Sequence, residues 1–142
     1  MTLYIDTTKK HDIEIAIKDS NRVVAKKKFK AKYKQAEKLL PEINSLISKK
    51  GYNLKDIDKI EVNNNSTDKT SFTALRIGII TANTLGYALG IPVIGAKRGE
   101  KKFQPKADPP LAGKEVARGN NKFDIIKPVY SKEPNVTISK NN

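Results

Sequence analysis

Two carboxylates, Asp6 and Glu61, best fit a catalytic role, because each lies on or at the end of a predicted strand. Carboxylates placed in this way can hold the divalent metal of a nuclease. Such a site needs a third or fourth carboxylate on later elements, and residues 72–98 contain none. The sequence has no cysteine and one histidine, His11, which excludes thiolate chemistry and a multi-histidine metal site within one chain. We therefore expect no catalytic residue and no metal site.

The turn after Asp6 does not predict a nucleotide site either. Residues 6–12 read DTTKKHD and lack the glycines that let a backbone wrap around phosphates. Asp6 is instead expected to order its own turn by accepting hydrogen bonds from nearby backbone amides. The sequence therefore indicates no cofactor.

Basic side chains are the other candidates for chemistry, since the formal net charge is +13. Strand alternation puts Lys26, Lys28 and Lys30 on one side of a strand, where they could follow RNA phosphates. Lys97 and Arg98 form part of a second basic cluster. No aromatic platform accompanies them, so we expect any such contact to be nonspecific. A lysine-rich compositional bias without a binding role remains an alternative.

The hydrophobic pattern predicts an α/β domain that positions these residues. Alternating apolar residues indicate a three-stranded antiparallel meander, and the period then changes to that of a helix. The expected elements are strands over 2–7, 12–18 and 22–31, a helix from about 35 to 50 that contains Pro41, a strand over 54–62, a helix over 71–90 and a strand over 91–95. The order is β-β-β-α-β-α-β.

The second predicted helix is apolar on more than one side. Ala74, Gly78, Ala82 and Gly86 recur at steps of four, which stacks small side chains along one face. After Arg76 no charge follows through residue 90, so packing on one sheet would leave apolar surface uncovered. Small residues let a second backbone approach closely, and we expect that backbone to belong to another chain. Packing inside the same domain is the alternative that this pattern leaves open.

Length and composition suggest one domain followed by a tail. With 142 residues we expect one core, over residues 1–96. Residues 97–142 contain few apolar side chains and two proline clusters, which is typical of a linker or extended tail. No stretch is apolar enough to span a membrane, so we expect a soluble, cytoplasmic protein.

The predicted element order is that of the ribonuclease-H-like half-domain found in actin, sugar kinases and Hsp70-type ATPases. Four motifs add a closer resemblance. They are 3–8 (LYIDTT), 39–43 (LLPEI), 71–78 (SFTALRIG) and 90–95 (GIPVIG). Over about its first hundred residues the chain resembles the TsaB (YeaZ) family of bacterial tRNA modification.

The sequence also departs from that family. Asp68, Lys69 and Thr70 replace its Gly-Pro-Gly turn, and Gln35 replaces the histidine that opens its first helix. Residues 127–134 resemble the family's C-terminal Pro-x-Tyr-x-Arg segment, with Lys132 in place of the arginine. The chain thus resembles a TsaB-type protein in which the second half-domain is missing and the tail is kept.

The resemblance implies a scaffold and no enzyme. TsaB-type proteins pair through their two helices with the catalytic subunit TsaD, which transfers a threonylcarbamoyl group to an adenosine of tRNA. We expect pairing with a TsaD-like partner, or a homodimer through the same face, and an additional tRNA contact through the lysines above. The expected interface residues are Leu39, Leu40, Ile43, Leu46, Ile47, Phe72, Ala74, Leu75, Gly78, Ile79, Ala82 and Gly86. A basic RNA-binding module and a metal-dependent ribonuclease-H-like nuclease are the alternative functions.

Overall fold

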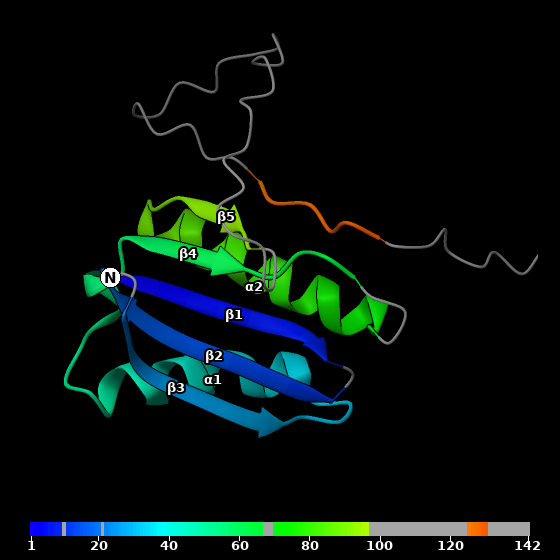
Figure 1. Ribbon diagram of the computed structural model, residues 1–142, viewed down its shortest axis with the longest axis horizontal. Coiled ribbons are helices and arrows are strands. Elements are labelled where there is room, and N and C mark those ends of the chain that lie inside the picture. The colour runs from blue at the N-terminus through cyan, green and yellow to red at the C-terminus, as the bar shows by residue number, and fades with distance from the viewer. Residues whose placement is uncertain (10, 21, 67–69, 97–124, 131–142) are drawn as a thin grey trace, which may run out of the picture.

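The structure is a computed structural model, and it describes residues 1–9, 11–20, 22–66, 70–96 and 125–130. The elements in chain order are β1 (Thr2–Lys9), β2 (Asp12–Asp19), β3 (Arg22–Lys30), α1 (Gln35–Ser48), the short 3-10 helix η1 (Leu54–Asp56), β4 (Lys59–Val62), α2 (Phe72–Leu89) and β5 (Val93–Gly95). The strands form one sheet in the order β3-β2-β1-β4-β5 (Figure 1). This architecture confirms the predicted α/β fold of the ribonuclease-H-like type.

The strand directions follow from the connections. β1, β2 and β3 pair antiparallel through short turns, as the alternating pattern predicted. β1 pairs parallel with β4, and β4 pairs parallel with β5. Each parallel step needs a crossover, which α1 and α2 provide. Both helices lie on the same face of the sheet (Figure 1).

The core lies between that face and the helices. Ile13, Ile15 and Ile17 alternate along β2 and are completely buried there, because successive strand residues point to opposite faces. Leu3 and Ile5 of β1 are buried on the same side. From the helices come the buried residues Leu39, Ile43, Leu46 and Ile47 of α1 and Ala74, Leu75, Ile79 and Ala82 of α2.

The strand predicted over 54–62 is wrong in its first half. Residues 54–56 form η1, because Asn53 and Asp56 make a reciprocal capping box. The Asn53 backbone N–H donates to Asp56 Oδ2 at 2.7 Å. The N-terminal ammonium of Met1 also donates to Asp58 Oδ2, at 2.7 Å. The strand therefore begins only at Lys59.

The ends of α2 are set by local chemistry. The Ser71 hydroxyl caps the first turn by accepting a hydrogen bond from the Ala74 N–H. Gly90 adopts φ 67°, the left-handed conformation that ends many helices and favours glycine. The helix therefore ends where the sequence predicted. Among the helices in the described part of the chain, none has the length and apolarity needed to cross a membrane.

Candidate functional site

Ten of the twelve residues expected at an interface are buried inside this chain's own domain. The ridge of small residues on α2 faces β1, and a Cβ on Gly78 would overlap the Thr7 hydroxyl and lie 3.0 Å from Thr7 Cγ2. The ridge therefore allows close approach to the chain's own sheet. Leu40 and Phe72 remain exposed, at 47% and 40%. A contact with a second chain is still a prediction, and it would use the outer sides of α1 and α2.

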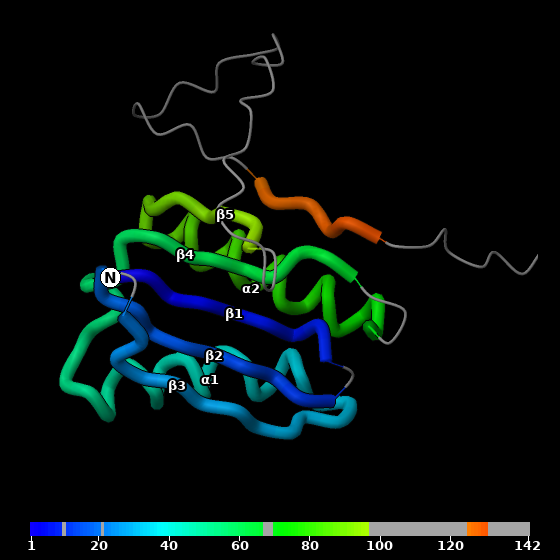
Figure 2. The backbone as a smooth tube through the Cα atoms, viewed as in Figure 1, coloured from blue at the N-terminus to red at the C-terminus, as the bar shows by residue number. Residues whose placement is uncertain are grey.

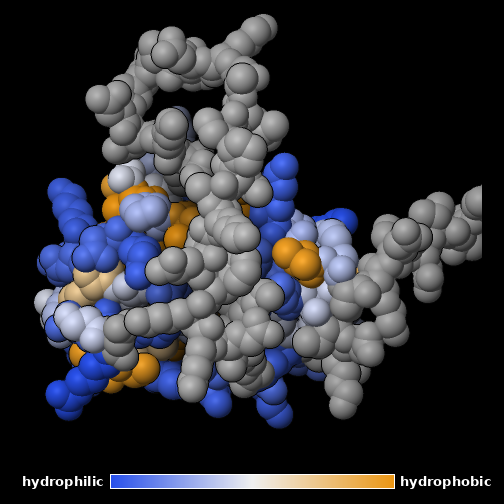
Figure 3. Space-filling view, turned by 45° about the horizontal axis from the view of Figure 1, so that its top comes forward, coloured by the Kyte–Doolittle hydropathy of each residue, from blue (hydrophilic) through white to orange (hydrophobic). Residues whose placement is uncertain are grey.

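The outer face of α2, defined here as Phe72, Arg76, Ile80, Thr84 and Tyr87, is largely apolar. These residues recur at steps of three or four and are all exposed. Ile80 is 63% exposed and Tyr87 is 76% exposed. Arg76 is the sole charged residue of the helix sequence. Hydrophobic patches are visible between hydrophilic ones on the surface shown in Figure 3. An apolar helix face exposed in this way is a typical contact surface for another protein.

Residues 125–130, called segment 125–130 below, lie against α2 and the loop that precedes it (orange in Figure 2). The Asn83 side chain of α2 accepts a hydrogen bond from Ile126 N and donates one to Ile126 O. Val129 forms a parallel bridge with Asn65 of the loop. The sequence predicted a linker or extended tail over residues 97–142; of that range the structure describes residues 125–130, which lie against the domain, and the rest lies outside the described residues.

Tyr130 contacts residues of a second sequence motif, which lies far from it in the chain. Its ring packs edge-on against Phe72, with centroids 5.2 Å apart, and its hydroxyl accepts a hydrogen bond from Arg76 Nε at 2.8 Å. Phe72 and Arg76 belong to the 71–78 motif, and Tyr130 belongs to the Pro-x-Tyr segment. The asparagine within the apolar helix, Asn83, was an available signal for a polar contact at this place.

A buried polar cluster lies where β1 and β4 end. Asp6 Oδ1 accepts hydrogen bonds from the backbone N–H and the hydroxyl of Thr8, at 2.9 and 2.6 Å. This confirms that Asp6 orders its own turn. Asn63 Nδ2 donates to the Thr8 hydroxyl, and Thr7 donates its hydroxyl to the Ala74 carbonyl of α2. The cluster thus ties the two central strands to α2.

Glu61 does not complete a metal site with Asp6. Its carboxylate accepts a hydrogen bond from Lys18 Nζ at 2.6 Å and lies 3.5 Å from Lys59 Nζ. Burial raises the pKa of Glu61, but Lys18 and Lys59 outweigh burial and leave the pKa below its usual value. Across the described ranges, no three His, Cys, Asp or Glu side chains come together in a way that could hold a metal ion.

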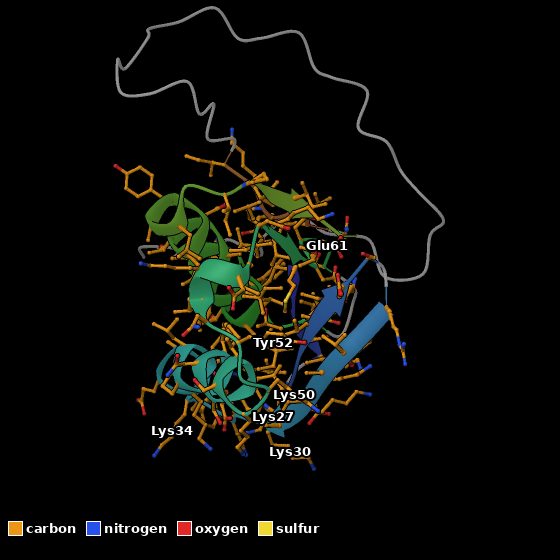
Figure 4. The ribbon with its side chains drawn as sticks, turned by 90° about the vertical axis from the view of Figure 1, so that its left-hand side faces the viewer. Lys27, Lys30, Lys34, Lys50, Tyr52 and Glu61 are labelled. Carbon is orange, nitrogen blue, oxygen red and sulfur yellow. The ribbon has the colours of Figure 1, made fainter. Side chains whose placement is uncertain are left out.

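The predicted alternation of β3 is confirmed. Lys26, Lys28 and Lys30 pair with Ala16, Glu14 and Asp12, so they point away from the helices. Lys27 points the other way and forms an ion pair with Glu42 of α1. Figure 4 shows Lys27, Lys30 and Lys34 around β3 and α1, apart from Glu61. Lys97 and Arg98 lie outside the described residues.

Glu14 neutralises part of the lysine cluster. Its carboxylate lies 2.7 Å from Lys26 Nζ, 3.3 Å from Lys28 Nζ and 3.5 Å from Lys9 Nζ. Burial raises the pKa of Glu14, but the hydrogen bonds and charges of Lys26 and Lys28 outweigh burial and lower the pKa to about 2. Glu14 is therefore a negative charge at the centre of three lysines on this face of the sheet.

Glu14→Gln should destabilise the domain at neutral pH and have little effect near pH 2. A folded-state pKa below the unfolded value means that the charged carboxylate stabilises the fold above about pH 4.5, and that this contribution is lost as the pH falls toward 2. We expect a loss on the order of 1 to 2 kcal/mol at pH 7. Urea unfolding of the wild type and of Glu14→Gln from pH 2 to 7 measures the difference in their free energies of unfolding. An effect independent of pH would contradict the charge argument.

The fold and the site define a class of protein. It is a ribonuclease-H-like α/β domain with an exposed apolar helix face and, among the residues that the structure describes, no cluster of side chains that could hold a metal ion. The family model "TsaD: tRNA N6-adenosine threonylcarbamoyltransferase" matches residues 27–100, just over half of the chain. The chain belongs to this family. No curated protein matches its sequence.

Two solved structures agree with this placement. YeaZ from Pseudomonas aeruginosa is 25% identical over 67% of this chain, with a TM-score of 0.58. A protein with similarity to peptidase YEAZ, also from Pseudomonas aeruginosa, is 25% identical over 67% of this chain, with a TM-score of 0.59. The chain spans 42% of the length of each. The resemblance to TsaB (YeaZ) found in the sequence is confirmed.

Proposed function

We propose that this chain is a non-catalytic subunit of the machinery that makes N6-threonylcarbamoyladenosine in tRNA. It binds a TsaD-like catalytic subunit through the outer faces of its two helices. The observation that carries the proposal is the exposed apolar outer face of α2 in a member of this family. Burying such a face against a partner contributes about 25 cal/mol per Å² of apolar area.

A homodimer through the same surface competes with that pairing. An apolar helix face without dense charge is self-complementary, so a two-fold axis can bring two copies of it together. Ile80 and Tyr87 would then contact the partner copy near the axis. The chain would prefer the TsaD-like partner over a second copy of itself if the complex with that partner buries the same apolar residues and leaves fewer polar groups of the interface without hydrogen bonds.

Absence of catalysis is part of the proposal. Two observations support this part of the proposal: Asp6 uses Oδ1 to order its own turn, and the Glu61 carboxylate is held by two lysines. We expect the isolated chain neither to hydrolyse ATP nor to cleave nucleic acid. Its role is to support the conformation or stability of the partner.

A tRNA contact through β3 is a second candidate, favoured by the shared face of Lys26, Lys28 and Lys30. Glu14 holds two of these lysines in ion pairs, which lowers the free positive charge available to phosphates. We therefore propose a weak, nonspecific contact whose affinity falls steeply with salt. It would assist the complex in holding its substrate.

The proposed function predicts that deleting the gene for this chain lowers the amount of the modified nucleoside in the tRNA of the cell. We expect deletion and an Ile80→Glu replacement to lower N6-threonylcarbamoyladenosine to a similar degree, measured by mass spectrometry of digested tRNA. Val23→Glu, a matched change at another exposed apolar residue on β3, should leave the wild-type level. Unchanged modification in the deletion strain would contradict the proposal.

A further inference from the structure

The backbone of segment 125–130 is held as a bound peptide is held. Asn83 donates to Ile126 O at 2.9 Å and accepts from Ile126 N at 3.1 Å. Asn64 Nδ2 donates to Lys127 O at 3.0 Å. Val129 N donates to Asn64 O at 2.7 Å, and Ser66 N donates to Val129 O at 2.8 Å. Five hydrogen bonds thus reach the main chain of three segment residues.

Side chains of the segment contribute at fewer positions. Ile125 is 64% exposed and Val129 is 52% exposed, while Ile126 and Tyr130 are partly buried against the core. Tyr130 makes the specific contacts, packing on Phe72 and accepting from Arg76. Pro128 has no N–H to satisfy, so its place in the segment leaves no donor unpaired. Main-chain bonds with a few side-chain anchors are typical of extended-peptide recognition.

The segment is held by main-chain hydrogen bonds more than by burial of its side chains. None of the six residues of segment 125–130 is fully buried, so little apolar area holds it in place. Elements of this kind open at a lower free energy than the core around them. The domain core closes without the segment, because the buried residues of the sheet, α1 and α2 pack on one another.

The covalent link between the domain and the segment is long. Ala96 N bonds to Val62 O, and Asn64 bonds to Lys127 O, so both ends of the intervening stretch meet the end of β4. That stretch, residues 97–124, contains 28 residues. Fully extended it could reach roughly 90 to 100 Å, far more than this short return requires. A free peptide of the same sequence should therefore be able to occupy the same place.

We propose that Asn64, Ser66, Arg76, Asn83 and Phe72 form a recognition site for an extended segment of the pattern apolar-x-Pro-x-Tyr, and that residues 126–130 are its ligand, bound in cis. The residues of the site come from α2 and from the loop before it. The site shares Phe72 and Arg76 with the outer face of α2, but the inference needs neither a TsaD-like partner nor tRNA.

A labelled peptide of residues 124–132, titrated against the full chain by fluorescence anisotropy, tests the site. The wild type should bind it weakly, because the cis segment already occupies the site. Full chain carrying Tyr130→Ala should bind it with an apparent Kd lower by about tenfold, the factor expected if the segment is docked about nine-tenths of the time. The same peptide with its tyrosine changed to alanine should bind neither protein.

Variants of the site itself separate recognition from nonspecific binding. In the Tyr130→Ala background, Asn83→Leu should abolish peptide binding, because it removes both bonds to Ile126. Ala88→Leu, at an exposed position of the same helix, is the matched control and should leave peptide binding unchanged. Circular dichroism verifies that each variant is folded. Equal binding by wild type and Tyr130→Ala, no binding by either, or binding that survives Asn83→Leu would overturn the proposal.

Discussion

Gly78→Leu is expected to destabilise the domain severely, lowering the melting temperature by about 10 °C or more. A Cβ at this position already overlaps the Thr7 hydroxyl, and Thr7 is a short, buried side chain whose hydroxyl is hydrogen-bonded to the Ala74 carbonyl. Overpacking costs about 1 to 3 kcal/mol, and loss of the Thr7 bond to the Ala74 carbonyl adds about 1 kcal/mol. For a domain of this size, each kcal/mol shifts the melting temperature by about 4 to 8 °C.

Three further variants show whether the clash with Thr7 causes the loss of stability. Ala88→Leu adds the same side-chain bulk at an exposed position of the same helix and should leave the melting temperature within a few degrees. Gly78→Ala should be milder than Gly78→Leu, and adding Thr7→Ala should recover part of its loss. If Gly78→Leu melts like wild type, α2 does not approach β1 as closely as described.

Ile80→Glu is expected to weaken binding of a TsaD-like partner by about a hundredfold or more while leaving the fold intact. Ile80 is 63% exposed in the isolated chain, so the new carboxylate stays in water and stability changes little. In a complex through the outer face of α2, the same carboxylate would lose its water in an apolar contact, with Arg76, one turn away, as the one charged residue of α2 beside it. Surface plasmon resonance with the partner immobilised measures the loss.

One control and one further variant of the outer face accompany that measurement. Val23→Glu introduces the same charge on β3 and should bind like wild type. Tyr87→Ala removes the most exposed aromatic residue of the outer face and should weaken binding, by about tenfold or more if it lies near the centre of the contact. Wild-type affinity in Ile80→Glu would place the contact elsewhere on the molecule.

The sequence predicted the sheet well because its signals are local. Ile13, Ile15 and Ile17 alternate with polar residues, and that period fixes the buried face of β2. Gly90 marks the end of α2 because its left-handed conformation favours glycine. The strand predicted from residue 54 failed because Asn53 and Asp56 cap each other, a side-chain pairing that outweighs the apolar pattern.

The site was harder to predict because its signals are not local. Small residues at steps of four allow close packing, but they do not say whether the second backbone belongs to the same chain. In α2 apolar residues surround the helix, so the sequence did not identify Ile80 and Tyr87 as the exposed face. Tyr130 lies 54 positions from Arg76, and no periodicity connects residues so far apart. Both the 71–78 motif and the Pro-x-Tyr segment can be seen in the sequence, but the contact between them is seen only in the structure.

The central claim, that this chain is a pairing subunit, is tested most directly by light scattering after size exclusion of the chain mixed with the TsaD-like protein from the same organism. We predict a peak whose mass equals one copy of each protein, formed by wild type and lost with Ile80→Glu. Two separate peaks at the masses of the free proteins, with wild type at micromolar concentration, would contradict the account.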